Sequence, residues 1–205
     1  MVKSLNSLRE FRKVLQFRRS IRHFSDKQID QSLIEEIVRC AATAPSGANK
    51  QPWRFVCISN SEIKRKIRVA AEIEEREFYK RRASKEWKKD LMPLETNPDK
   101  KFLEDAPWII VVFRLIKDDD GGNVYYGEES VGIATGLLLA AAQFYGLATL
   151  THTPSPMRFL TEILDRPAYE RPYMLIPIGY PAQNSTVPIA ALQKKKLSEV
   201  LISIT

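Results

Sequence analysis

Residues 124–145 constrain the fold of this chain more than any other stretch of the sequence. They predict a helix that is apolar almost all round, and the longest apolar run within it, residues 131–142, has 12 residues. A helix that is apolar on every side has to be buried. A run of this length is also shorter than the ~20 residues that span a bilayer. We therefore expect a soluble protein with this helix at its centre and no membrane contact.

Helical and strand-like segments alternate along the rest of the chain. Residues 108–113 are nearly all β-branched or aromatic, which predicts a strand buried on both faces. Residues 61–91 interleave Lys or Arg with Glu and predict a helical region with one wet face, broken near Ala83 and Ser84. Further helices are predicted at 4–17, 31–44 and 157–164, further strands at 53–59, 147–151 and 174–179, and a loop or lid at 92–101. This order predicts one α+β or α/β domain that spans residues 1–205.

The last segment, residues 182–205, has no obvious place in that domain. It is polar at first and then, over residues 197–204, has the composition of a strand. No later helix follows on which it could fold back. We therefore expect a C-terminal arm that packs on a partner subunit.

The charge balance favours anionic partners without choosing among them. Lys and Arg number 32 against 25 Asp and Glu, which gives a net charge of +7. Acidic residues are mixed too evenly among the basic ones for a stripe that follows phosphates, so nucleic acid is not expected as a partner. Cys40 and Cys57 both lie in apolar runs and indicate reduced thiols, and the polar N-terminus is no signal peptide. A cytoplasmic location is expected.

Three clusters have the residue types of a ligand site. The first helix ends in residues whose guanidinium groups and hydroxyl could bind a phosphate. Taken without the other clusters, the same residues indicate an ordinary helix C-terminus with basic side chains. These residues are Arg18, Arg19, Ser20 and Arg22. Residues 44–53 carry Ser46 among small residues that let a backbone approach a flat ligand, or they form an ordinary loop. Residues 149–155 offer hydroxyls at a strand end, for a cofactor atom or simply for solvent.

A fourth candidate is the pair Glu75 and Tyr79, which project from the same face of a helix because they lie four residues apart. Most such pairs are merely solvated. Other chemistries lack their motifs: no glycine-flanked serine elbow, no Walker loop and no dinucleotide-binding glycine motif is present. The two histidines and two cysteines have no metal-ligand spacing, so no metal is expected.

Considered together, the order and spacing of these motifs resemble the flavin-dependent nitroreductase superfamily. The motifs are Arg-Arg-Ser-Ile-Arg at 18–22, Ala-Pro-Ser-Gly-Ala at 44–48, Gln-Pro-Trp at 51–53 and Pro-Ile-Gly-Tyr-Pro at 177–181. A finer pattern is similar to the iodotyrosine deiodinases and covers roughly residues 15–204. It consists of Glu75, Tyr79, Trp87, Asp90, Leu91 and Lys100.

The resemblance implies a nitroreductase-like α+β fold, with a central mixed sheet flanked by helices, and a homodimer that exchanges its arms. It also implies bound FMN, reduced by NAD(P)H directly or through a reductase. The implied cofactor-binding residues are Arg18, Arg19, Ser20, Arg22, Ser46, Thr151, His152, Thr153 and Lys194. Thr153 is also the implied catalytic residue, because its hydroxyl would lie near flavin N5 and favour one-electron chemistry. Lys194 stands where the family has arginine. The lysine keeps the positive charge but cannot form the paired hydrogen bonds of a guanidinium group.

The same resemblance implies a halotyrosine substrate and its reductive dehalogenation, from iodotyrosine to tyrosine and iodide. Glu75 suits the substrate's ammonium group and Lys100 its carboxylate, while Tyr79 adds a hydrogen bond at that end. The backbone amide of Ala48 would meet the phenolate oxygen, and residues 79–101 would close over the ring. A general NAD(P)H-dependent nitroreductase or quinone reductase would use the same flavin residues. An FMN storage or sensing module without turnover is a further alternative.

Overall fold

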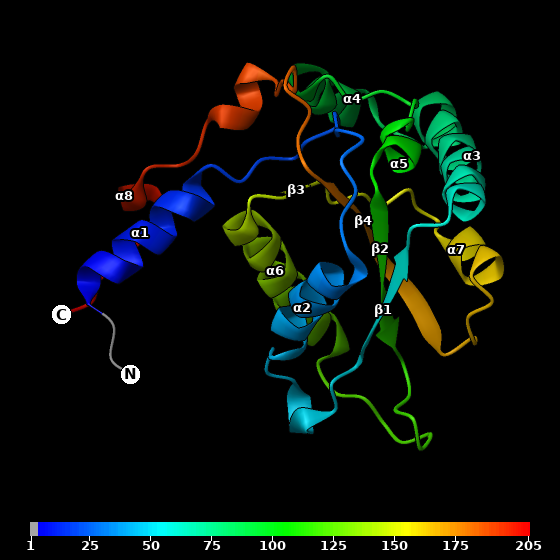
Figure 1. Ribbon diagram of the computed structural model, residues 1–205, viewed down its shortest axis with the longest axis horizontal. Helices are drawn as coiled ribbons and strands as arrows, with labels where there is room; N and C mark the ends of the chain where they lie inside the picture. Colours follow the sequence, from blue (N-terminus) through cyan, green and yellow to red (C-terminus); the bar gives the residue numbers. More distant parts are fainter. Residues whose placement is uncertain (1–3) are drawn as a thin grey trace.

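A four-stranded antiparallel sheet forms the centre of the computed structural model, which describes residues 4–205 (Figure 1). The strands lie in the order β1 (Trp53–Ile58), β2 (Trp108–Leu115), β4 (Glu170–Gly179) and β3 (Ala148–Thr149). Strand β2 is central, and its residues from Ile109 to Phe113 are fully buried. The prediction of a strand buried on both faces, made from the continuous apolar run, is confirmed.

The sheet differs from the expected mixed arrangement. All pairings between the named strands are antiparallel. Within residues 4–205, parallel pairing is limited to an isolated bridge between Ser20 and Thr149, where the Ile21 N–H donates to the Thr149 carbonyl at 3.1 Å. Strand direction depends on how distant segments pack, and the local residue pattern does not encode it.

Helices α2 (Gln31–Ala42) and α6 (Gly127–Tyr145) pack on each other and cover one face of the sheet. One side of α6 is buried through Val131 and Leu138, as its composition predicts. Its other side exposes Ile133, Leu137 and Phe144, the last to 69%. The expectation that the whole helix is buried is therefore wrong for a single chain, because the helix that contacts α6 on that second side, residues 5–16, leaves these side chains exposed.

The opposite face is covered by helices α3 (Ser61–Glu77), α5 (Phe102–Asp105) and α7 (Arg158–Ile163). Ile67, Leu103 and Leu160 fill the core beneath them. Lys64 is buried there as well, and its Nζ donates to the carbonyl oxygens of Glu104 at 3.0 Å and Ala106 at 2.6 Å. A buried ammonium is tolerated because its donors are satisfied in this way.

Beyond α3 the chain runs directly into the rim of a pocket. A π-helical turn, η2 (Phe78–Arg82), ends at Ala83, whose backbone is extended. Helix α4 (Lys85–Leu91) then begins with Ser84 as its N-cap, where Oγ accepts from the Trp87 N–H at 3.0 Å. The predicted break near Ala83 and Ser84 is confirmed. A short 3-10 turn, η3 (Met92–Leu94), leads into the predicted loop.

Both ends of the chain project from the body (Figure 1). Helix α1 (Leu5–Gln16) has no buried residue and contacts α6. The C-terminal segment forms a 3-10 turn, η4 (Ile189–Leu192), and a one-turn helix, α8 (Leu197–Val200). Residues 197–204, which have the composition of a strand, form no strand in the single chain, since a strand needs a partner edge and this segment has none. None of the described helices combines the length and the apolarity needed to cross a membrane.

Candidate active site

A pocket of about 520 Å³ lies where α3, the π-helical turn, the loop before α5 and the segment after β3 meet. It is a hollow of the right size for a small molecule. Nine of the residues that the sequence analysis named individually line it. They are Arg22, Glu75, Tyr79, Trp87, Leu91, Lys100, Thr151, His152 and Thr153.

Glu75 and Lys100 form an ion pair in this pocket. Lys100 Nζ lies 3.2 Å from Glu75 Oε2, and both side chains are largely buried. Burial lowers the pKa of Lys100, and the attraction of Glu75 opposes that shift. A buried pair of charges is stable only while each keeps a partner. A ligand that carries one positive and one negative group can replace this single pair by two.

Helix α3 also holds the backbone of Lys100 in place. The Lys100 N–H donates to Glu72 Oε1 at 3.1 Å, and Glu72 is in turn bonded by Arg68 at 3.4 Å and Arg76 at 3.1 Å. The three α3 side chains lie four residues apart along one helix face. Sequence reasoning did not single out Glu72, although its spacing from two arginines was the available signal.

Tyr79 lies on the π-helical turn that follows the helix carrying Glu75. Its hydroxyl donates to Thr96 Oγ1 at 2.8 Å, so the turn is tied to the loop that carries Lys100. Phe78 packs edge-on against both Tyr79 and Trp87, with ring centroids 5.3 and 4.8 Å apart. These aromatic side chains form an apolar rim. Thr96 was not predicted, because its role depends on a contact that local sequence does not indicate.

The segment after β3 brings Thr151, His152 and Thr153 to the pocket floor. A bridge fixes its backbone, since His152 and Leu175 exchange two backbone hydrogen bonds of 2.9 Å. The two threonines are exposed, whereas the His152 side chain is nine-tenths buried. Burial, together with the charges of Lys100 and Arg22, lowers the pKa of His152 to about 3. The imidazole is therefore neutral at physiological pH.

The arginine segment supplies positive charge beside the pocket. Arg22 lines the pocket, and its burial lowers the pKa of its guanidinium. Arg19 donates through Nη1 to the carbonyl oxygens of Gln16 and Arg18, while its buried Nε has no partner within residues 4–205. An orphaned guanidinium N–H next to a second arginine fits an anionic group such as a phosphate. The residues present are therefore compatible with a phosphate-bearing cofactor.

Six predicted residues do not line this pocket in the single chain: Arg18, Arg19 and Ser20 of the arginine segment, and three residues from more distant segments. Ser46 Oγ accepts from the Gln51 N–H at 2.8 Å and so closes its own loop. Ala48 is exposed on the 3-10 turn η1 (Gly47–Asn49), with φ of 51°, at the opposite end of the sheet (Figure 1, cyan). Lys194 is exposed in the C-terminal segment and does not line the pocket.

No metal site accompanies the pocket, since the described part of the chain contains no group of three or more His, Cys, Asp or Glu side chains arranged to hold an ion.

Fold and site together define a member of the nitroreductase class of proteins. The model of the nitroreductase family matches residues 15–180. The chain belongs to this family.

Within the family, the chain is similar to iodotyrosine deiodinases. It is 50% identical to the iodotyrosine deiodinase of Haliscomenobacter hydrossis over 97% of this chain and 90% of that protein. It is 40% identical to human iodotyrosine deiodinase 1 over 95% of this chain and 68% of that protein. A crystal structure of oxidized iodotyrosine deiodinase bound to FMN and 3-iodo-L-tyrosine superposes with a TM-score of 0.82 at 26% identity, covering 95% of this chain and 98% of the other.

Proposed function

We propose that this protein is an FMN-dependent oxidoreductase that reductively deiodinates iodotyrosine to tyrosine and iodide. The observation that carries the proposal is the buried Glu75–Lys100 ion pair, flanked by Tyr79, in a pocket that also exposes Thr151 and Thr153. Similarity to iodotyrosine deiodinases over nearly the whole chain supports it. The solved relative with FMN and 3-iodo-L-tyrosine supports both the cofactor and the substrate class.

Glu75 and Lys100 select a zwitterion in this proposal. The ammonium group of the amino acid pairs with Glu75, its carboxylate pairs with Lys100, and the Tyr79 hydroxyl adds a hydrogen bond. Two new ion pairs offset the loss of the one at 3.2 Å. A neutral nitroaromatic would break that pair without replacing it, which is unfavourable in a buried site. These contacts to the ammonium and carboxylate groups of the substrate hold its iodinated ring in the reactive position.

Arg18, Arg19, Ser20, Arg22 and Lys194 would hold the FMN phosphate and ring edge, and residues 151–153 would contact the flavin ring. When bound, FMN supplies two electrons, and with one proton these convert the C–I bond to C–H and release iodide. Thr153 would be the catalytic residue, with its hydroxyl donating near flavin N5. NAD(P)H, directly or through a reductase, provides the electrons.

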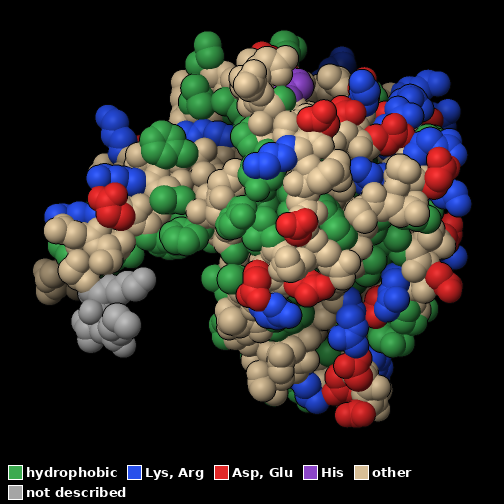
Figure 2. Space-filling model, in the orientation of Figure 1, with side chains coloured by type: hydrophobic (Ala, Val, Ile, Leu, Met, Phe, Trp, Pro, Cys, Tyr) green, Lys and Arg blue, Asp and Glu red, His purple; other side chains and the backbone are tan. Residues whose placement is uncertain are grey.

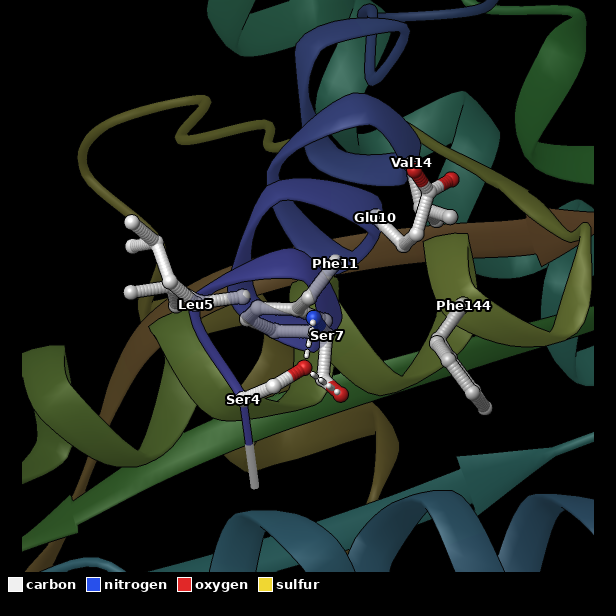
Figure 3. Close-up of a pocket in the computed structure, with 8 residues that line it drawn as sticks. Ser4, Leu5, Ser7, Glu10, Phe11, Val14 and Phe144 are labelled. Atoms are coloured by element: carbon white, nitrogen blue, oxygen red, sulfur yellow. Dashed lines mark hydrogen bonds between the residues drawn. The ribbon is translucent and has the colours of Figure 1, made fainter.

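A second copy of the chain completes the site. Ser46 and Ala48 lie at the far end of the sheet, and both chain ends project from the body. A groove of about 700 Å³ between α1 and Phe144 of α6 is lined mainly by apolar side chains (Figure 3). Figure 2 shows hydrophobic side chains gathered on the face that borders α1. These features support a homodimer in which residues 182–205 pack on the partner, whose Ser46 contacts the flavin and whose Ala48 amide meets the phenolate.

Closure of residues 79–101 excludes water from the reacting bond. The Tyr79–Thr96 hydrogen bond and the Lys100–Glu72 hydrogen bond already anchor both ends of this lid. A closed lid strengthens the ion pairs beneath it, because the local dielectric falls. A cytoplasmic location suits a protein whose two cysteines are free thiols.

Binding to the flavin-loaded protein tests the proposal. Quenching of FMN fluorescence is measured with 3-iodo-L-tyrosine, with L-tyrosine and with a neutral nitroaromatic. The proposal predicts tight binding of iodotyrosine alone, and a loss of that affinity of at least tenfold in Glu75→Gln. Equal responses to all three ligands, or an unchanged affinity in Glu75→Gln, would instead favour a general nitroreductase.

A further inference from the structure

The side chain of His152 faces a different part of the pocket from its threonine neighbours. Successive side chains of an extended segment point to opposite sides. Leu150 and His152 share one side: Leu150 is buried in the core beneath α3 and α5, and His152 packs edge-on against Phe102 of α5, with ring centroids 5.8 Å apart. Thr151 and Thr153 take the other, exposed side. The imidazole is therefore directed toward α3 and α5, and the two hydroxyls are directed away from them.

The imidazole ends in a buried nitrogen without a partner. His152 Nε2 forms no hydrogen bond within residues 4–205, although the side chain is nine-tenths buried. Buried polar atoms are paired in the great majority of native structures, so an orphaned one that lines a pocket points to a ligand. The carboxylate oxygen Glu75 Oε1 lies 3.9 Å from it, too far for a direct hydrogen bond.

The charges around His152 keep it available as an acceptor. Glu75 faces it from α3, Lys100 from the loop before α5, and Arg22 from the arginine segment. Burial lowers the pKa of His152 most and the two cations lower it further, to about 3, so the ring stays neutral. A neutral imidazole has one nitrogen with a free lone pair. With the proton on the other nitrogen, Nε2 accepts.

We propose that His152 is a substrate-binding residue, whose Nε2 and Glu75 Oε1 together receive the ammonium group of the amino-acid substrate. A nitrogen about 2.9 Å from each of two acceptors that are 3.9 Å apart can donate to both, because an ammonium group carries three N–H donors. This inference rests on the proposed function and deepens it: Glu75 supplies the charge, and His152 supplies the second acceptor that selects a free amino group.

The test compares two ligands that differ only in that amino group. One is 3-iodo-L-tyrosine, and the other is 3-(4-hydroxy-3-iodophenyl)propionic acid, which lacks it. Affinities are measured by quenching of FMN fluorescence in the flavin-loaded full chain. His152→Leu should weaken iodotyrosine binding by about ten- to a hundredfold, the effect of losing a hydrogen bond to a charged group. Binding of the deaminated ligand should change less than twofold.

Two further variants separate this role from simple packing. His152→Gln keeps an acceptor and should recover most of the iodotyrosine affinity. Leu175→Val disturbs the core beside the same backbone bridge without removing Nε2, and it should change both affinities by the same factor. Equal losses for both ligands in His152→Leu would overturn the inference, as would loss of FMN from both His152 variants.

The result also distinguishes this inference from the proposed function. If wild-type protein does not prefer iodotyrosine, the proposed function fails and the role of His152 falls with it. If wild type prefers iodotyrosine and Glu75→Gln loses that preference while His152→Leu keeps it, the role of His152 alone is wrong.

Discussion

At the scale of single residues, the pocket is organised by charges that are buried and paired. Glu75 and Lys100 neutralise each other at 3.2 Å, while Glu72 holds the Lys100 backbone at 3.1 Å. His152 lies against the same cluster as a neutral ring. Buried charges and an unpartnered imidazole nitrogen gathered in one hollow are typical of a functional site, and a ligand there would supply the partner that His152 Nε2 lacks.

The buried neutral state of His152 predicts a dependence of stability on pH. Its pKa is about 3 in the folded chain and ordinarily 6.5, so between those values the unfolded chain binds a proton that the folded chain does not. Stability therefore falls as pH decreases through this window, by up to about 3 kcal/mol for this group at pH 4.5. His152→Leu removes the effect. Urea unfolding at pH 7 and pH 4.5 should show that the difference between wild type and variant shifts in favour of the variant at pH 4.5.

A difference between wild type and His152→Leu that is the same at both pH values would contradict a neutral buried imidazole. Protonation of other groups affects both proteins alike, so the comparison isolates His152.

Some site residues could be predicted from local sequence, and others could not. Glu75 and Tyr79 could be paired from their spacing, because four residues return a helix to the same face. Lys100 came only from family resemblance, since 25 residues of chain separate it from Glu75. The spacing of Glu72 from two arginines was a signal that was not used, but its bond to Lys100 and the bond of Thr96 to Tyr79 could not be assigned, because they join α3 and its π-helical turn to a distant loop.

At the scale of elements, the π-helical turn and the capped start of α4 shape the rim of the pocket. Ser84 begins α4, and Trp87 of that helix packs on Phe78 of the turn. Helices of two turns are marginal without such a cap. The lid proposed over residues 79–101 is therefore expected to depend on a single N-cap bond.

Ser84→Ala tests this dependence. Loss of an N-cap hydroxyl costs about 1 kcal/mol, here applied locally to α4. We expect faster amide hydrogen exchange over residues 85–91 and an iodotyrosine affinity lowered by about fivefold, with the melting temperature nearly unchanged. Ser4→Ala removes the matching N-cap bond of α1, where Oγ accepts from Ser7, and should leave exchange over 85–91 unchanged. Equal exchange in Ser84→Ala and wild type would contradict the role of the cap.

Elements with a strong local pattern were predictable, and elements that depend on distant contacts were not. The buried strand β2 and the break at Ala83 followed from composition and periodicity. The antiparallel direction of the sheet, the exposed side of α6 and the helical turn α8 did not, because tertiary or quaternary packing decides them.

At the scale of the whole molecule, one chain presents surfaces that suit a partner. The apolar residues of the C-terminal segment are strongly exposed, with Ile202 at 87% and Ile204 at 97%. Helix α1 and the outer side of α6 add further apolar surface. Exposed apolar side chains gathered in this way are typical of a protein–protein contact surface.

Removal of residues 197–205 tests the proposed dimer. The truncation deletes Leu197, Val200, Leu201, Ile202 and Ile204, whose burial on a partner would stabilise association at about 25 cal/mol per Å² of apolar surface. Sedimentation velocity should show a dimer for the full chain and a shift toward monomer for the truncated chain, with weaker FMN retention. A full chain that sediments as a monomer would contradict the proposal.

Iodide release measures the central claim most directly. Flavin-loaded protein is reduced anaerobically with dithionite and given 3-iodo-L-tyrosine, and iodide and tyrosine are counted against the electrons supplied. We predict one iodide and one tyrosine for every two electrons, and kcat/KM at least tenfold lower in Glu75→Gln, which loses a charged contact to the ammonium group. Reduction of a nitroaromatic without any release of iodide from iodotyrosine would contradict the account.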